Sequence, residues 1–230
     1  MKVLAFDTST KFLSVACLED GRQCACFHEE AGIRHSEILV ATIKSLLEEA
    51  AWRVQQLDLV CVGLGPGSFT GLRIGVATVK ALAAATAVKA VGVPSMDASA
   101  VKCAHLGAKI APFLDAHKGK VYTAVYSTTG KLPRRDTDYL LTDVEEFLAG
   151  LKEDVVLFGS GVIKYKKQLE LSRRVECLED IDWYPHAADI ARLGTERAAK
   201  AEANADKLDP MYMHSKYCNV TEPRKENGST

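Results

Sequence analysis

The sequence lacks an uninterrupted apolar run of the roughly 20 residues that a membrane-spanning helix needs. It also lacks a basic N-terminal region followed by an apolar segment, since a short strand is predicted to begin at Lys2. Neither sign of charge dominates, because 29 Lys and Arg residues face 30 Asp and Glu residues and the formal net charge is -1. These absences predict a cytoplasmic protein without membrane contact, which meets any RNA through a partner rather than through a basic surface of its own.

Patterns for metal ligands, disulfides and nucleophiles are scarce as well. The seven cysteines are odd in number and most lie in apolar stretches such as Val60-Cys61-Val62, which favours reduced, buried thiols. No two histidines stand four residues apart on a predicted helix, and no zinc-ligand spacing is present. Ser68 lies in no nucleophile-elbow motif. A solvated turn explains Asp115 and His117 at least as well as a catalytic role does, so no catalytic residue is predicted.

The apolar fraction of 47% is enough for a sizeable core, and its periodicity predicts an α/β chain. A first lobe over residues 1–107 has the order of one ribonuclease-H-like lobe. Its predicted strands span 2–7, 12–18, 23–29, 57–64 and 90–93, and its helices 35–52, 69–88 and 95–106. A smaller second lobe spans 108–218, with strands at 110–114, 120–126 and 155–158, and helices at 142–151 and 185–203. The last helix is expected to pack back toward the first lobe, and the polar tail 219–230 is expected to be disordered.

The most distinctive stretch is Gly65-Pro66-Gly67-Ser68-Phe69-Thr70-Gly71-Leu72-Arg73-Ile74-Gly75, between a buried strand and a helix. Glycines in this setting let the backbone approach an anion, although neither the P-loop nor the dinucleotide fingerprint is satisfied. With the acid that ends the first strand, this stretch supplies the candidates for nucleotide binding: Asp7, Gly65, Gly67 and Ser68. A tight turn in which Ser68 or Thr70 caps the helix explains the glycines equally well.

The helix that follows is rich in alanine, at 77, 81, 83, 84, 85 and 87. Small side chains allow another helix to approach closely. Packing on this chain's own sheet is the more common reason for such a composition. A helix that is apolar on more than one face needs more than one neighbour, however, so a partner surface is a second possibility.

Three stretches resemble the TsaB (YeaZ) family: Phe6-Asp7-Thr8-Ser9, the glycine-rich stretch from Gly65 to Gly75, and Leu114-Asp115-Ala116 with Gly119 and Val121-Tyr122. Shorter similarities at Gly159-Ser160-Gly161, Pro185-His186-Ala187 and Pro210-Met211-Tyr212 extend the resemblance to about residue 212. Met213-His214 departs from the family, in which Leu-Arg is usual, so no role of that arginine is carried over.

The resemblance implies an actin-like ATPase (ribonuclease H-like) fold: two lobes with mixed sheets flanked by helices, the second lobe truncated. It implies a non-catalytic scaffold for the complex that makes threonylcarbamoyladenosine in tRNA. The partners would be TsaD, as a heterodimer, and TsaE, with a functional link to TsaC, an indirect contact with tRNA and a possible homodimer. TsaD would bind the nucleotide and metal, because Ser95 and Ser99 stand here where TsaD has its ligand histidines. No cofactor of its own is therefore expected.

In the family, two helices of the first lobe pack against the equivalent helices of TsaD. The matching segments are 35–52 and 72–88, and the candidate contacts are Leu39, Ile43, Leu46, Val76, Val79 and Lys80. Two alternatives remain open at this point: a metallopeptidase-like enzyme, and an ATP-dependent enzyme of the same fold.

Overall fold

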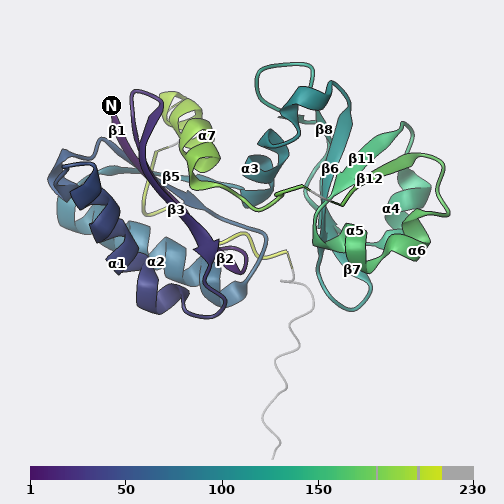
Figure 1. Ribbon diagram of the computed structural model, residues 1–230, viewed down its shortest axis with the longest axis horizontal. Coiled ribbons are helices and arrows are strands. Elements are labelled where there is room, and N and C mark those ends of the chain that lie inside the picture. The colour runs from purple at the N-terminus through teal and green to yellow at the C-terminus, as the bar shows by residue number, and fades with distance from the viewer. Residues whose placement is uncertain (180, 201–202, 214–230) are drawn as a thin grey trace, which may run out of the picture.

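Two separate sheets organise the chain in a computed structural model that describes residues 1–179, 181–200 and 203–213 (Figure 1). The strands are β1 Lys2–Asp7, β2 Phe12–Glu19, β3 Arg22–Glu30, β4 Leu59–Gly63, β5 Lys89–Val93, β6 Lys109–Asp115, β7 Lys120–Thr123, β8 Tyr126–Ser127, β9 Arg134–Arg135, β10 Leu140–Asp143, β11 Val155–Phe158 and β12 Val175–Leu178. The helices are α1 His35–Glu49, α2 Phe69–Thr86, α3 Ser95–Val101, α4 Val144–Gly150, α5 Ser160–Lys164, α6 Lys166–Leu169 and α7 Ala187–Ala199.

The first sheet has the order β3-β2-β1-β4-β5. Its first three strands form an antiparallel meander, and β4 and β5 run parallel to β1. The turn between β2 and β3 is made by Asp20 and Gly21, whose φ angles of 50° and 80° match the right-handed twist of a two-residue hairpin.

Helices cover both faces of this sheet, α1 and α2 on one and α7 on the other (Figure 1). The alternation of side chains along β1 divides them between two cores. Leu4 and Phe6 pack with the residues of α1 and α2, whereas Val3 and Ala5 pack with those of α7. The last helix of the described chain therefore belongs to the first lobe, although the second lobe lies between them in sequence.

The second sheet has the order β10-β7-β6-β11-β12, with β8 and β9 attached beside β6. Strands β6, β11 and β12 are parallel, and β7 and β10 run antiparallel to their neighbours. Helices α4, α5 and α6 lie in this lobe, and α3 lies between the two lobes (Figure 1). No helix in the part of the chain that the structure describes is both long and apolar enough to cross a bilayer.

The predicted α/β class, with mixed sheets flanked by helices in two lobes, is confirmed. Several predicted boundaries are wrong. The helix predicted over 35–52 ends at Glu49, where the chain turns through Ala51 with a φ of 56°. The one predicted over 95–106 ends at Val101, before a short 3₁₀ turn. The strand predicted over 120–126 is divided into β7 and β8, and the helix predicted over 185–203 begins at Ala187. Strands β9, β10 and β12 and helices α5 and α6 were not predicted. The tail 219–230 lies outside the described residues.

Candidate functional site

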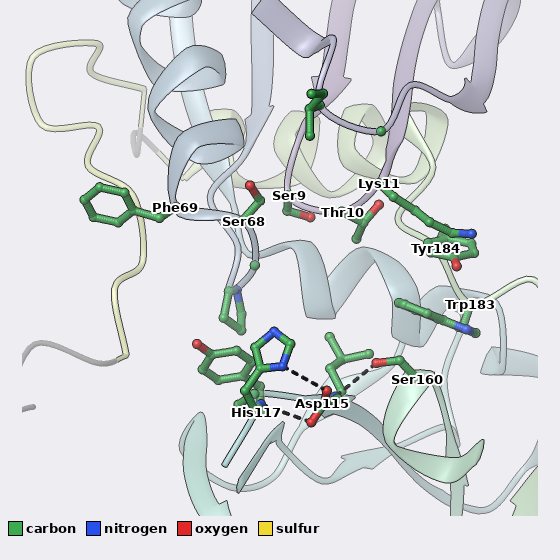
Figure 2. Close-up of a pocket in the computed structure, with 17 residues that line it drawn as sticks. Ser9, Thr10, Lys11, Ser68, Phe69, Asp115, His117, Ser160, Trp183 and Tyr184 are labelled. Carbon is green, nitrogen blue, oxygen red and sulfur yellow. Dashed lines mark hydrogen bonds and ion pairs between the residues drawn. The ribbon is translucent and has the colours of Figure 1, made fainter. Parts of the chain in front are cut away.

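A cleft of about 860 Å³ lies between the two lobes (Figure 2). The turn after β1 and the start of α2 line it on the first-lobe side, and the end of β6 and the start of α5 line it opposite. The segment before α7 adds two aromatic rings at one side. The polar and aromatic residues of the lining are Ser9, Thr10, Lys11, Ser68, Phe69, Asp115, His117, Tyr122, Ser160, Trp183 and Tyr184.

The glycine-rich loop packs directly on the turn after β1. The Ser68 amide donates to the carbonyl of Ser9 at 2.7 Å, and the Thr8 hydroxyl donates to the carbonyl of Gly71 at 2.7 Å. A Cβ atom at Gly67 would lie 2.1 Å from the Ser9 carbonyl oxygen, and one at Gly71 would lie 2.0 Å from that of Thr8. These glycines are therefore required for the close approach of two backbones, whatever else the loop contacts.

The loop also uses its own amides. Ser68 is the N-cap of α2, and its hydroxyl accepts from the Gly71 amide at 3.2 Å. The Gly65 amide donates to the Ser95 hydroxyl at 3.0 Å. The Gly65–Pro66 peptide bond is cis. Because these amides and that of Ser68 have partners within the chain, they are not open to a phosphate, and the arrangement favours the structural interpretation of the motif.

Asp7 lies behind the cleft rather than in its lining, and only 1% of it is exposed. Its carboxylate accepts from the amide of Ser9 at 2.8 Å and from the hydroxyls of Ser9 at 2.7 Å and Ser95 at 2.6 Å. Burial raises the pKa of Asp7 above its usual value, and these donors oppose that shift. The carboxylate joins the turn after β1 to the start of α3, and Ser95 extends this link to Gly65 of the glycine-rich loop.

The second lobe contributes Asp115, which is mostly buried at the end of β6. The ammonium of Lys164 lies 2.6 Å from it, the Tyr165 hydroxyl donates at 2.9 Å, and the His117 amide donates at 3.0 Å. Burial raises the pKa of Asp115, but the bonds from Lys164 and Tyr165 outweigh it and the net shift is downward. The carboxylate is thus a charged, internally paired group at the base of the cleft (Figure 2).

Of the four nucleotide-binding candidates, the structure places Gly67 and Ser68 in the lining of the cleft. Asp7 and Gly65 are buried behind it. Hydrogen bonds through Ser9 and Ser95 link Asp7, Gly65 and Ser68 into one unit, and Gly67 packs against Ser9 beside it. That unit joins two segments of the first lobe, and nucleotide binding remains a prediction.

Comparison with known proteins shows which protein family the chain is related to. Residues 28–220 match the family described as "TsaD: tRNA N6-adenosine threonylcarbamoyltransferase". The Bacillus subtilis "tRNA threonylcarbamoyladenosine biosynthesis protein TsaB" is 30% identical over 93% of this chain and 94% of its own. The chain belongs to the TsaB family. The Escherichia coli TsaB protein is 29% identical over 70% of this chain and 72% of its own. The structure named "YeaZ from Pseudomonas aeruginosa" has a TM-score of 0.81 at 28% identity and covers 92% of this chain and 99% of that one.

The TsaD relationship raises the question of a metal at Ser95 and Ser99. Both residues are buried, and both hydroxyls have partners in this chain. Ser95 bonds Asp7 and Gly65, and the Ser99 hydroxyl donates to the Ser95 carbonyl at 3.2 Å. Serine hydroxyls are weak ligands for transition metals compared with imidazole. The residues at these two positions therefore do not fit a metal site.

The predicted TsaB-family interface contacts need correction. Five of the six lie in the core between the first sheet and its helices, with exposed fractions of at most 6%: Leu39, Ile43, Leu46, Val76 and Val79. Their helical spacing marks the side that packs on this chain's own sheet. Lys80 is partly exposed, but its ammonium lies 3.7 Å from the Asp209 carboxylate and donates to the Asp206 carbonyl at 3.4 Å.

The outward side of these two helices carries different residues. On α2 an exposed row consists of Arg73, Ala77, Ala81, Ala84 and Ala85, spaced by about one turn. On α1, Val40 has 64% of its surface exposed, and Ala41 beside it is exposed as well. We call this surface of α1 and α2 the outer helical face. Beyond Arg73, whose guanidinium stacks on the ring of Phe69, its side chains are small and leave room for the close approach of another helix.

Sequence reasoning missed the aromatic side of the cleft. Trp183 and Tyr184 stack with ring centroids 4.0 Å apart, and Tyr184 also lies 4.2 Å from the ring of Phe12 on β2. The one feature of the sequence that could have indicated this side of the cleft is the adjacent pair of aromatic residues just before Pro185. Nothing local in the sequence indicates that this pair returns from the second lobe to the first.

Proposed function

We propose that this chain is a non-catalytic subunit of the machinery that makes threonylcarbamoyladenosine in tRNA, and that it supports a TsaD-type subunit by docking against it. The observation that carries the proposal is the relationship over nearly the whole chain to a protein named for this biosynthesis. TsaE and TsaC are further expected members of the same process, and contact with tRNA would be indirect. The net charge of -1 fits a protein that does not bind RNA by itself.

The hydrogen bonds around Asp7 support the absence of a catalytic site of its own. In this chain the two serines in place of ligand histidines are used to hold Asp7 and the start of α3. The glycine-rich loop likewise uses its amides to hold the turn after β1. Groups that could serve phosphate or metal chemistry are thus employed in stabilising the first lobe.

The outer helical face supports docking. Small side chains on α2 beside the exposed Val40 of α1 leave a surface on which two helices of a partner can pack closely. A TsaD-type partner with a related first lobe would present an equivalent pair of helices, which gives a pseudosymmetric four-helix contact. A second copy of this chain could occupy the same face when that partner is absent.

Complementation tests the proposed function. In a bacterial strain whose own gene for this subunit is deleted, expression of this chain with the TsaD-type protein of the same source is expected to restore threonylcarbamoyladenosine in total tRNA. Mass spectrometry of digested nucleosides measures it. If the modified nucleoside stays at the normal level in the deleted strain, with no other subunit standing in, the proposal is wrong.

An ATP-dependent enzyme is the second candidate, because Ser9, Thr10 and Ser68 line the cleft on the side opposite Asp115. Under our proposal, ATP with Mg²⁺ raises the melting temperature of the isolated chain by less than about 2 °C, since a ligand present at no more than its Kd stabilises little. Differential scanning fluorimetry measures this. A large rise that Asp115→Asn abolishes, together with ATP hydrolysis, would favour the enzyme instead.

A further inference from the structure

Three side chains with metal-ligating atoms meet at the edge of the first sheet: His28 on β3, and Asp182 and His186 in the segment that leads to α7. One ligand atom from each lies within 4.8 Å of the other two. None of the three lines the interlobe cleft. We propose that His28, Asp182 and His186 bind one divalent transition-metal ion of the zinc class.

The fold brings these residues together through Ser14 on β2. Ser14 is the cross-strand partner of His28, and its buried hydroxyl accepts from the Ala187 amide at 2.8 Å. This bond fixes the first residue of α7 against β2, and it places His186, the preceding residue, over β3. The rings of His28 and His186 lie with centroids 3.8 Å apart at an interplanar angle of 27°. His28 and His186, which are far apart in the sequence, are therefore brought together by the pairing of β2 with β3 and by the bond from α7 to Ser14.

The ring nitrogens of His28 lack hydrogen-bond partners in the described part of the chain, and both are buried. A buried polar atom without a partner is costly and points to a ligand or an ordered water. Burial lowers the pKa of His28 to about 4, and the nearby His186 adds to the shift. Imidazole is a common metal ligand in proteins, and both nitrogens of this ring lack partners among the described residues.

Asp182 and His186 supply the other ligands. The carboxylate lies 2.6 Å from Nε2 of His186, and both side chains are open to solvent, with 53% and 27% exposed. Ligands of a tetrahedral zinc ion lie roughly 3.4 Å apart, given bonds of about 2.0–2.1 Å. The Asp182 oxygen and Nε2 of His186, which lie 2.6 Å apart, would therefore separate by somewhat less than about 1 Å when both bind one ion, and the exposed Asp182 side chain is free to make that movement. Two neutral imidazoles with one carboxylate suit zinc, cobalt or nickel, and further coordination positions stay open for water.

Charged groups of both signs lie near the site. Lys102 acts on His28, and its ammonium lies 3.8 Å from the nearly buried carboxylate of Asp189, which Arg192 contacts at 2.9 Å. The Asp182 carboxylate supplies the negative charge among the three proposed ligands. A bound metal would tie the edge strand β3 to the segment 182–186. That segment carries Trp183 and Tyr184, so the ion would fix the aromatic side of the cleft. In the competing arrangement without metal, His28 is stacked on His186, and His186 is hydrogen-bonded to Asp182.

Cobalt(II) is the probe, because its visible absorption reports the ligands that surround it. The purified full chain, stripped with a chelator, is expected to bind one equivalent of Co²⁺ with a nitrogen- and oxygen-type spectrum. Zn²⁺ in 100-fold excess over its Kd should raise the melting temperature by about 5–10 °C. His28→Phe keeps a ring stacked between Phe12 and His186 but removes both nitrogens. It should weaken binding more than about 100-fold, because even loss of an outer partner costs about 10–100-fold.

Two further variants make the result decisive. Asp182→Asn changes an exposed side chain without threatening the fold, and it should also weaken Co²⁺ binding at least tenfold. Cys26→Ser removes an exposed thiol from the same strand and should leave binding unchanged. The proposal is overturned if no saturable binding occurs, if His28→Phe binds as tightly as the native chain, or if Cys26→Ser abolishes the signal. None of these measurements depends on the proposed role in tRNA modification.

Discussion

Replacing Ala77 by glutamate is expected to weaken binding to a TsaD-type partner by roughly 100-fold or more, while the melting temperature of the free chain stays the same. Ala77 lies in the exposed row of α2, so the new side chain is solvated in the free chain, where such surface changes alter stability by at most about 0.5 kcal/mol. In a packed four-helix contact the same carboxylate would be buried without a partner, at a cost of about 3–5 kcal/mol. Isothermal titration calorimetry with the partner measures the difference.

The neighbouring position provides the matched comparison. Val76 has 6% of its surface exposed and packs in the core between α2 and the sheet. Val76→Glu is therefore expected to lower the free energy of unfolding by about 4 kcal/mol, because it buries a charge in this chain's own interior. Ile163→Glu is the control for added charge, since Ile163 is 65% exposed on α5 in the other lobe. If Ala77→Glu binds the partner as well as Ile163→Glu does, the outer helical face is not the interface.

This pair of residues also shows where the sequence was informative and where it was not. The spacing of Leu39, Ile43 and Leu46 correctly predicts a helix with one apolar side. A periodic apolar stripe identifies the side of the helix that is buried within its own domain, and on α1 that side packs on β2 and β3. Apart from Arg73, the residues that we assign to the outer helical face are alanines and a single valine, which no periodicity distinguishes from ordinary surface positions. An interface therefore cannot be assigned from the stripe itself.

The two lobes also differ in how well their strands can be predicted from the sequence. Strands of the first sheet are five to nine residues long, and their alternating or continuous apolar patterns are visible in the sequence. In the second lobe, β8 and β9 have two residues each, and their existence depends on pairing with β6 and with one another. Local propensity has little to act on in such short segments. Their prediction requires knowledge of the neighbouring strand.

Sites formed from segments far apart in the sequence could not be predicted from local sequence patterns either. The glycine-rich motif was correctly singled out, but its partners are backbone carbonyls of Thr8 and Ser9, which a sequence pattern does not display. His28 and His186 are brought together by the pairing of β2 with β3 and by the Ser14 bond to α7. Histidines on separate elements give no spacing signal of the kind that a helical metal pair gives. In both cases tertiary contacts decide the role of the residue.

The carboxylate network around Asp7 predicts a second large effect, at Gly63 near the end of β4. A Cβ atom there would lie 1.8 Å from Oδ2 of Asp7 and 2.8 Å from the hydroxyl of Ser95. Gly63→Ala must therefore displace a buried carboxylate from its donors, and we expect the free energy of unfolding to fall by about 3–5 kcal/mol. Urea denaturation followed by circular dichroism measures it. Gly150→Ala is the control, since no atom lies within 4 Å of a Cβ added at that helix end.

A double-mutant cycle identifies the cause of the loss. Asp7→Ala removes the group with which the new methyl collides, and by itself it leaves buried donors of Ser9 and Ser95 without an acceptor. In that background Gly63→Ala should cost at least about 2 kcal/mol less than in the native chain, because contacting residues are strongly coupled. Equal costs in the two backgrounds would mean that the methyl group acts on something other than Asp7. The coupling energy thus measures how much of the loss at Gly63 comes from displacing the buried Asp7 carboxylate.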